Sequence, residues 1–523
     1  MPESLLLTVN RRYGNFPLNV IRIFNLYLRM PSGYKYSWLI IAILTCLYLC
    51  FPCGLSTGDS WYYAASVKYG REIFVPHHLL YNALGLVFCR IPSQMGFEVI
   101  SSMKVMNALF AFLTLIAVQQ ILYRYKLTEK QTAIIISLAG LSFSVIRYAT
   151  ENETYIVPLF FALIASFNYL KYLDNRGVKN LLYTGLWASI SILFHQTYIF
   201  WWLGLLFGFI LEKNKKQILL YLLISLIVPV TYLIVILTIQ GGFVWHNIIG
   251  FLLGDFNTTA KLEISVRALF FSVVNLGRSF IQVHGYMFNM VKGSFFWVLP
   301  GVVSLLFGAS ALLKFPGKGT ISIPKRFAFV HIVILILQLI FAALLNGNAE
   351  FMVMIPVLVF ILFPFFTSGY EKFLFRILVG MAIWNISYGL IPLHYKDGAP
   401  EKFLCKAAMS VDKPVVIVSD EQLINSMIYY QTGETIFPNI YKSPAVLQLL
   451  RAEPTILDEV IVNSLKRGVA VVTNCINENT ISKSSIIEGT VNHDFFRRYD
   501  AILIKSWKLI TGTSSVHRIE KKL

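Results

Sequence analysis

Charged residues are scarce in this chain. Asp, Glu, Lys and Arg together make up 14% of its 523 residues, against roughly 25% in ordinary soluble domains. Apolar residues reach 56%, and they fall into runs of about 17 to 25, the length needed to cross a hydrocarbon layer about 30 Å thick. This composition excludes an ordinary cytosolic globular protein and predicts a polytopic α-helical membrane protein.

Cysteine is also scarce, and its spacing is irregular. Three of the six cysteines fall on or beside one apolar run and the other three are scattered; they are Cys46, Cys50, Cys53, Cys89, Cys405 and Cys475. This spacing matches neither a zinc site nor a disulfide framework. The sequence therefore predicts no metal site and no firm cofactor, and a requirement for a divalent metal stays open.

The net charge of +18 follows a membrane pattern. Eleven apolar runs are expected to cross the bilayer, and a further embedded or re-entrant stretch is possible within 243–290. The runs are 38–55, 97–123, 131–147, 153–170, 180–194, 197–211, 217–240, 294–313, 327–345, 350–366 and 376–394. With a cytoplasmic N-terminus, the inside segments hold 20 Lys and Arg residues, against 7 in the opposite loops before residue 396. This excess predicts the orientation, and it requires no nucleic-acid partner.

Three parts are expected along the chain. Residues 1–37 are predicted to be a cytoplasmic or interfacial amphipathic leader, and 38–395 a transmembrane domain. Residues 396–523 hold 16 basic and 14 acidic residues, a balance typical of a solvated domain. Because the number of crossings is odd, this last part is expected outside, as a small extracytoplasmic α/β domain. The expected localisation is the bacterial plasma membrane.

Two regions outside the apolar runs have local patterns of their own. The first outer loop, 56–96, predicts helices over 61–69 and 79–88, which would rest on the outer membrane surface with Lys68 and Arg71 as surface contacts. The last part predicts strands and helices in alternation. The strands are 414–419, 468–473 and 499–505, and the helices are 421–431 and 444–466. No Gly-rich phosphate loop opens these helices, so a nucleotide-binding role has little support.

Asp59 is the strongest candidate for a functional residue. It lies in Thr57-Gly58-Asp59-Ser60, directly after the first apolar run. A carboxylate at the edge of a membrane is costly and is a functional candidate by default. The alternative is that Asp59 is the N-cap of the helix that begins near Trp61, a position where Asp is favoured. Its position along the chain does not decide between the two.

Other polar side chains fall at the same predicted end of the membrane runs. They lie in three short turns and are Arg147, Glu151, Glu153, His195, Gln196, Asn346, Asn348 and Glu350. Each can be accounted for without a function, since Glu complements the dipole at a helix N-terminus and a loop histidine is usually solvated. Because such residues recur at several independent turns on one side, the sequence predicts a shared polar cavity at the outer face.

The order of these motifs resembles that of the GT-C superfamily of polyprenyl-phosphate-sugar glycosyltransferases, most closely its bacterial protein O-mannosyltransferase-like members. The resemblance covers about the first 395 residues. The motifs are Gly58-Asp59-Ser60, Pro76-His77-His78-Leu79-Leu80-Tyr81, Glu151-Asn152-Glu153-Thr154-Tyr155, His195-Gln196 and Asn348-Ala349-Glu350. The chain departs from better-known members in having a single acidic residue at the loop start, and His77-His78 where relatives often have His-Pro.

The resemblance implies a reaction and roles for these residues. A sugar would pass, with inversion, from a polyprenyl-phosphate donor to the hydroxyl of a protein, lipid or glycan acceptor, in contact with membrane lipids, and Asp59 would be the general base. The implied binding residues fall into two groups. Those near the leaving phosphate are Arg147, Arg278 and Lys292 as cations, with His77 or His78 as hydrogen-bond donors; those that bind or support the substrate are Glu151, Glu153, His195 and Glu350.

Alternative roles stay open for one of these residues and for the whole chain. Lys292 fits equally well as a side chain that reaches toward lipid headgroups. A lipid-linked-sugar flippase or other transporter, or a non-catalytic protein of cell-envelope assembly, would also have many spans. Transporters usually show internal repeats and charged residues near the midplane, whereas this sequence has no clear repeat and its ionisable residues fall at one face.

Overall fold

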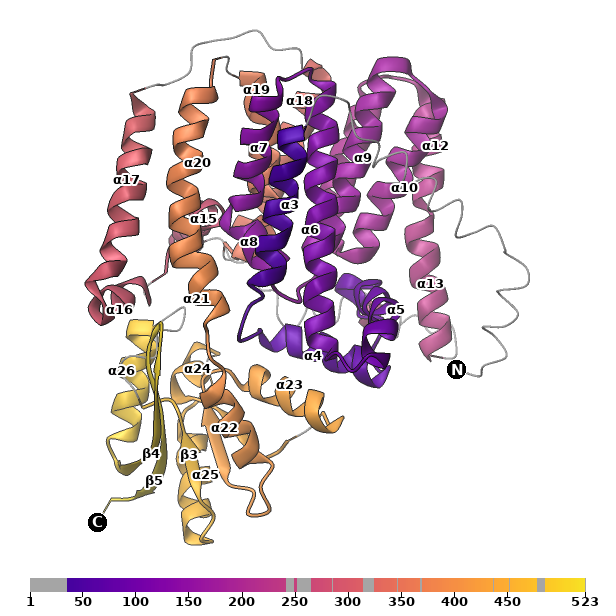
Figure 1. Cartoon of the computed structure of the whole chain (residues 1–523). Coiled ribbons are helices and arrows are strands. Elements are labelled where there is room, and N and C mark those ends of the chain that lie inside the picture. Colours follow the sequence, from indigo (N-terminus) through magenta and orange to yellow (C-terminus); the bar gives the residue numbers. More distant parts are fainter. Residues whose placement is uncertain are drawn as a thin grey trace.

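Helices make up most of the molecule (Figure 1). The computed structural model describes residues 35–240, 249–251, 265–284, 286–313, 324–345, 347–366, 369–435, 437–450, 452–476 and 485–522. Most of the expected leader at 1–37, parts of the stretch 243–290, and Asn346 lie outside the described residues.

A bundle of helices forms the larger part of the structure (Figure 1). Its helices are α3 (Lys35–Cys50), α6 (Val99–Arg124), α7 (Glu129–Leu141), α8 (Phe143–Ala149), α9 (Ile156–Asn175), α10 (Val178–Phe194), α11 (Ile199–Ile210), α12 (Lys215–Ser225), α13 (Ile227–Gln240), α15 (Val266–Phe280), α16 (Tyr286–Gly293), α17 (Val298–Leu312), α18 (Lys325–Leu344), α19 (Ile355–Phe366), α20 (Glu371–Asn385) and α21 (Ile391–His394). Short 3₁₀ turns, η1 (Pro76–His78), η2 (Gln196–Tyr198) and η4 (Ala349–Met352), stand between some of them.

The bundle has the helix lengths of an integral membrane protein. Among the described residues, six helical segments are long and apolar enough to cross a bilayer, and α7 and α8 add a seventh if this pair, bent by 65°, is one span. Five further apolar helices have only 10–17 residues, fewer than the about 20 that a full crossing needs. The expected count of eleven crossings is therefore not confirmed.

The most buried part of the bundle lies where α3, α6, α7 and α9 pack together. The hydroxyl of Tyr48 on α3 donates to the carbonyl of Gly140 on α7 at 2.7 Å. A Cβ atom at Gly140 would lie 2.6 Å from a methyl carbon of Leu44, so a larger residue there would require the Leu44 side chain to move. Small residues are the usual means by which membrane helices approach closely.

A small α/β domain follows the bundle. It comprises α22 (Ala399–Ala408), β1 (Val415–Val418), α23 (Glu421–Thr432), β2 (Ile440–Lys442), α24 (Pro444–Leu449), α25 (Thr455–Lys466), β3 (Val471–Thr473), α26 (Ser485–Phe496), β4 (Tyr499–Leu509) and β5 (Gly512–Lys521). The strand order is β2-β1-β3-β5-β4. Val416 pairs in parallel with Ile440 and Val472, while β5 is antiparallel to β3 and β4. All four residues of β1 are buried, as expected of a strand covered on both faces.

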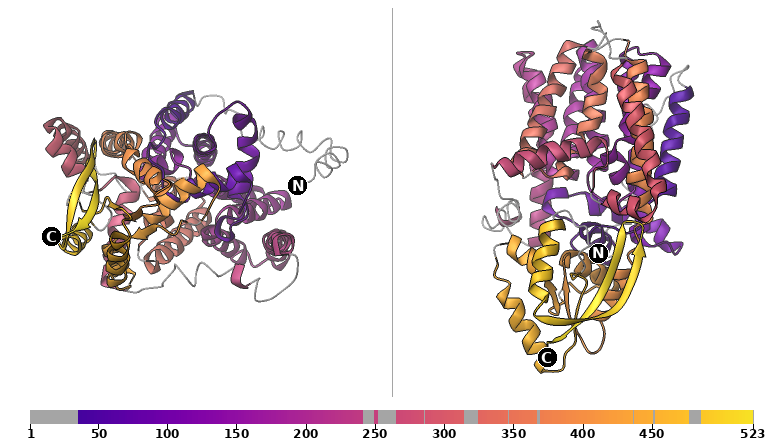
Figure 2. Two further views of the ribbon diagram at one scale, coloured as in Figure 1. Left: turned by 90° about the horizontal axis from the view of Figure 1, so that it is seen from below. Right: turned by 90° about the vertical axis from the view of Figure 1, so that its left-hand side faces the viewer.

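The α/β domain lies at one end of the bundle in both side views (Figures 1 and 2); we call this the domain end. Two helices of the long first loop, α4 (Gly58–Tyr69) and α5 (Tyr81–Gln94), lie at the same end (Figure 1). They confirm the two helices expected at 61–69 and 79–88. The N-cap of α4 is Thr57, whose hydroxyl accepts from the backbone N–H of Ser60 at 3.1 Å. Asp59 is therefore not the capping residue.

Candidate active site

Asp59 lies in the first turn of α4, where its carboxylate faces the α/β domain. Its Oδ1 atom accepts a hydrogen bond from the side-chain amide of Gln422, in the first turn of α23. Burial and the negative charges of Glu350 and Asp420 raise the pKa of Asp59 to about 6, although the hydrogen bond from Gln422 acts in the opposite direction. A carboxylate with this pKa is mostly ionised at neutral pH and binds a proton readily.

The loop between α8 and α9 supplies two more carboxylates beside the start of α4. Glu153 accepts from the hydroxyl of Thr57 at 2.5 Å, and the hydroxyl of Ser60 lies 3.2 Å from Oε1 of Glu151. Asn152 donates to the backbone carbonyl of Ser60 at 2.8 Å. Both glutamates are buried. Burial, followed by the charges of Glu350 and Asp59, raises the pKa of Glu153 well above its ordinary value.

A buried asparagine of α6 holds this loop in place. Asn107 donates to the carbonyls of Glu151 at 2.7 Å and Glu153 at 2.6 Å. The hydroxyl of Tyr81 lies 2.8 Å from Oδ1 of Asn152 and 3.1 Å from Oδ1 of Asn107. Because these groups are fully buried, each hydrogen bond is needed to offset the cost of burying its polar atoms. The backbone that carries both glutamates is thus rigidly placed.

Glu350 and two arginines extend the site across the bundle. Glu350 lies in η4 and accepts from the hydroxyl of Tyr155 at 3.2 Å. Arg147, on α8, is close enough to interact electrostatically with Glu350, Glu153 and Glu151. Arg278, on α15, interacts with both Arg147 and Glu350. Two arginines that repel each other beside a carboxylate are arranged to receive further negative charge.

Two buried histidines complete the cluster on another side. The ring of His195 lies 4.8 Å from the ring of Tyr155 and 6.4 Å from the ring of His78, measured between centroids. Burial, followed by the charge of His77, lowers the pKa of His78 to about 3. Burial also lowers the pKa of His195 well below its ordinary value. Both imidazoles are therefore neutral at physiological pH and act as hydrogen-bonding groups.

Most of the residues singled out in the sequence meet at the domain end. His77 joins them through Gln196, with Nδ1 of His77 3.2 Å from Oε1 of Gln196. Lys292 is on α16, which also lies at the domain end (Figure 1) and is bonded to the α/β domain through Asn289 and the carbonyl of Thr511 at 3.1 Å. Its side chain is exposed. This position fits the alternative in which Lys292 reaches toward lipid headgroups.

Lys68 and Arg71, expected to be surface contacts, are both exposed, and both also bond to the α/β domain. Lys68 donates to the carbonyl of Tyr430 at 2.7 Å, and Arg71 donates to the carbonyl of Gly433 at 3.1 Å. Both carbonyls are at the C-terminal end of α23, where exposed carbonyl groups favour a cation. The two cations therefore fasten α4 to the α/β domain.

Gln422 is not among the residues expected from the sequence. This residue is 363 positions from Asp59, and no local pattern joins the two. The approach of their helices is close, because a Cβ atom at Gly58 would lie 3.1 Å from both the Gln422 side chain and the Leu423 backbone nitrogen. The one local sign is Asp420, which caps α23 by accepting from the N–H of Leu423 at 3.0 Å. It places Gln422 in the first turn of a helix.

In the part of the chain that the structure describes, no three His, Cys, Asp or Glu side chains are grouped so that they could hold a metal ion. A requirement for a divalent metal stays open.

Comparison with solved structures identifies the fold. No family model matches the sequence, and no curated protein is similar to it. ArnT from Cupriavidus metallidurans, in its apo state and bound to undecaprenyl phosphate, superposes with a TM-score of 0.53 at 9% identity, over 93% of this chain and 98% of that chain. An oligosaccharyltransferase of Archaeoglobus fulgidus in the apo form has 13% identity and a TM-score of 0.48, over 90% of this chain and 73% of that one.

The chain is thus an integral membrane protein with a small C-terminal α/β domain. Its fold is similar to that of ArnT, of which it covers 98%. At 9% identity this likeness concerns the fold alone. The O-mannosyltransferase-like subtype stays a prediction.

Proposed function

We propose that this protein is a membrane glycosyltransferase that moves a sugar from a polyprenyl-phosphate donor to an acceptor hydroxyl, with inversion at the anomeric carbon. The domain end of the bundle faces the outside of the cell in this proposal. The fold shared with ArnT supports the proposal, and so does the binding of undecaprenyl phosphate by ArnT.

The single observation that carries the proposal is that Asp59 and two arginines all lie within electrostatic reach of the same carboxylate, that of Glu350. Asp59 and Arg147 both interact electrostatically with Glu350, and Arg278 interacts with Arg147. A transfer from a lipid phosphate needs a base for the acceptor and cations for the leaving group. Asp59 can act as the base, and the two arginines are the cations.

The proposed step is a single displacement. The acceptor hydroxyl gives its proton to Asp59 while its oxygen forms a bond to the anomeric carbon, and the bond from that carbon to the phosphate oxygen breaks. A base with a pKa of about 6 is ionised at neutral pH, and such proton transfer typically contributes about 10² to 10⁴ in rate. The departing polyprenyl phosphate gains negative charge, so Arg147 and Arg278 stabilise the transition state more than the ground state.

The remaining polar groups have supporting roles in this proposal. Glu153 holds a proton more tightly than an ordinary glutamate. It donates hydrogen bonds to sugar hydroxyls or accepts hydrogen bonds from them. His78 and His195 are neutral and do the same without repelling the arginines. Glu151 and Glu350 balance the positive charge of Arg147 until the donor binds.

The test uses the full chain, purified and reconstituted in lipid, with a panel of polyprenyl-phosphate sugars. Release of polyprenyl phosphate is followed for wild type, Asp59→Asn and Asp412→Asn. Asp412 is an exposed residue of the α/β domain, so its substitution makes the same chemical change away from the site. We expect turnover by wild type and Asp412→Asn, and a loss of about 10² or more in Asp59→Asn. Equal turnover by all three proteins would remove Asp59 from the chemistry.

A lipid-linked-sugar flippase is a second candidate, favoured by one observation. The break between α7 and α8, with its 65° bend, is a feature that transporters use to build sites within the bilayer. The same reconstituted vesicles distinguish the two candidates. Movement of an intact lipid-linked sugar between leaflets, without release of polyprenyl phosphate from any donor, would support the flippase and contradict the transferase.

A further inference from the structure

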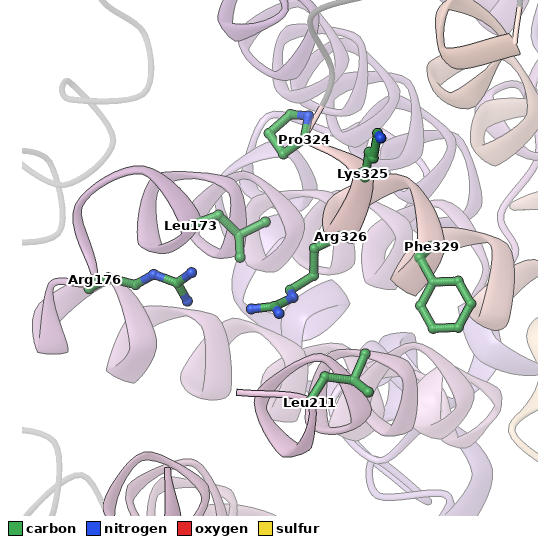
Figure 3. Close-up of a pocket in the computed structure, with 7 residues that line it drawn as sticks. All are labelled: Leu173, Arg176, Leu211, Pro324, Lys325, Arg326 and Phe329. Atoms are coloured by element: carbon green, nitrogen blue, oxygen red, sulfur yellow. The ribbon is translucent and has the colours of Figure 1, made fainter. Parts of the chain in front are cut away.

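A cavity with a cationic and apolar lining lies at the ends of three helices (Figure 3). These helix ends are opposite the domain end of the bundle (Figure 1). The cavity has a volume of about 520 Å³ and opens where α9 and α11 end and α18 begins. Its lining combines three cationic and four apolar residues, namely Arg176, Lys325, Arg326, Leu173, Leu211, Pro324 and Phe329. None of these residues takes part in the proposed transferase site.

One partly buried carboxylate, that of Glu212, pairs with both arginines. Arg176 at the end of α9 and Arg326 at the start of α18 both form ion pairs with the same oxygen of Glu212. The Glu212 side chain is 13% exposed, so it is only partly screened by water and favours two cationic partners. Figure 3 shows both guanidinium groups extending into the space between these helices. The pair is therefore held in one orientation before any ligand arrives.

The charges around the cavity do not balance. Three cations, Arg176, Lys325 and Arg326, surround the single carboxylate of Glu212, which leaves an excess of two positive charges. Each guanidinium has five N–H donors, whereas Glu212 engages one nitrogen of each arginine. Most donors therefore remain for another anion. Arginine forks match the geometry of phosphate oxygens particularly well.

The position of the cavity indicates the source of that anion. Two of the bordering helices, α9 and α18, are long enough to span the membrane, and the cavity lies at their ends. The ends of spanning helices lie at the depth of the lipid headgroups. Leu173, Leu211 and Phe329 supply apolar walls that suit the glycerol and upper acyl part of a lipid. The chain that follows Leu211 adds Lys213 in a turn and Lys215 and Lys216 at the start of α12 to the positive field.

We propose that this cavity binds a phosphate group, carried by an anionic phospholipid of the leaflet opposite the domain end. In the bound state, Arg176 and Arg326 donate to the phosphate oxygens while they keep their bonds to Glu212, and Lys325 covers the open side. The ends of α9, α11 and α18 are then joined through one headgroup.

The test measures the thermal stability of the delipidated full chain in detergent as lipid is added. The probes are phosphatidylglycerol, phosphatidylcholine and inorganic phosphate, each titrated separately. The variants are Lys325→Gln, Arg326→Gln and Arg326→Lys, with Lys372→Gln as the matched control. Lys372 is an exposed residue in the first turn of α20, at the same end of the bundle as the cavity (Figure 1), and it does not line the cavity.

We expect phosphatidylglycerol to raise the melting temperature at lower concentrations than phosphatidylcholine does. The apparent affinity for phosphatidylglycerol should fall about fivefold in Lys325→Gln, since each basic residue near an anionic lipid surface contributes on the order of 1 kcal/mol. Arg326→Gln should lose more, and Arg326→Lys less. Lys372→Gln should bind as wild type does. Because Lys325 has no ion pair with another described residue, its loss tests the cavity without breaking the Glu212 pairs.

The probes also separate the two sources of phosphate. Stabilisation by phosphatidylglycerol alone supports a lipid headgroup. Equal stabilisation by inorganic phosphate, with the same loss in Lys325→Gln, supports the phosphate site but assigns it to free phosphate. Equal affinity for phosphatidylglycerol and phosphatidylcholine, or equal effects of Lys325→Gln and Lys372→Gln, would overturn the proposal.

Discussion

The hydrogen bond from Gln422 to Asp59 leads to a prediction about the pH dependence of the proposed reaction. A hydrogen bond to an ionised group contributes about 1.5 to 3 kcal/mol. Asp59 is partly exposed, so water replaces part of the lost bond and the lower end of this range applies. About 1.4 kcal/mol corresponds to one pH unit in a pKa. Gln422→Ala should therefore raise the pKa of Asp59 from about 6 to about 7.

The sign of the effect follows from the role of Asp59 as a base. The ionised form is active, so activity rises with pH through the pKa, and a higher pKa moves this rise to higher pH. At pH 6.5 the ionised fraction falls from about three quarters to about one quarter. We expect kcat/KM of Gln422→Ala to be about threefold lower at pH 6.5 and close to wild type above pH 8.5.

The assay is the release of polyprenyl phosphate, followed from pH 5 to 9. The matched control is Gln431→Ala, at the other end of the same helix, where Gln431 is exposed. Its profile should coincide with that of wild type. If Gln422→Ala lowers kcat/KM by the same factor at every pH, or leaves the profile unchanged, Gln422 does not position Asp59 through the proton equilibrium.

Three further predictions concern stability. Because the folded state raises the pKa of Asp59 from 3.8 to about 6, the wild-type protein loses stability as pH rises between these values. The gain in melting temperature from Asp59→Asn should therefore be larger at pH 8 than at pH 4. An equal gain at both pH values would contradict this. Glu153→Gln keeps an acceptor for the Thr57 hydroxyl, so its unfolding free energy at pH 7 should stay within about 1 kcal/mol of the wild-type value. Glu153→Ala should lose about 2 to 4 kcal/mol. If Glu153→Ala unfolds at a higher temperature than Glu153→Gln, the hydrogen bond to Thr57 does not stabilise the fold. Lys68→Ala with Arg71→Ala removes two bonds to α23 carbonyls, each contributing about 1 kcal/mol. Amide exchange in α23 should accelerate about thirtyfold, and unchanged exchange would mean that these cations do not hold the domain.

Local patterns were sufficient to predict several elements. Helices α4, α5 and α23 and the strands β1 and β3 lie where the periodicity of apolar residues placed them. The expected helix at 444–466 is instead two helices, α24 and α25, because Pro454 falls between them and lacks the N–H that a continuous helix needs. Strand β5 escaped prediction because its sequence, GTSSVHRIEK, has little of the alternation that marks a half-buried strand.

Topology was sufficient to predict part of the candidate site. When helices cross a membrane in succession, every second connection between them lies on the same side. Glu153 and Glu350 were therefore expected on one side, although 197 positions separate them. No comparable rule predicts contacts between the helical bundle and the α/β domain. Gln422 touches Asp59 only because α23 packs along α4, and that packing depends on the whole α/β domain. Asn107 was missed for another reason: a single asparagine in an apolar helix gives no sign of which carbonyls it will bind.

The distance along the chain between α4 and α23 has a consequence for biogenesis. Lys68 and Tyr69 bond to the carbonyl of a residue that follows them by 362 and 361 positions. At about 5 to 20 residues per second, a ribosome makes that later segment roughly 20 to 70 seconds after α4. Asp59 thus lacks its Gln422 partner throughout membrane insertion, and the newborn protein acquires the complete surroundings of this carboxylate only as the last stage of its maturation.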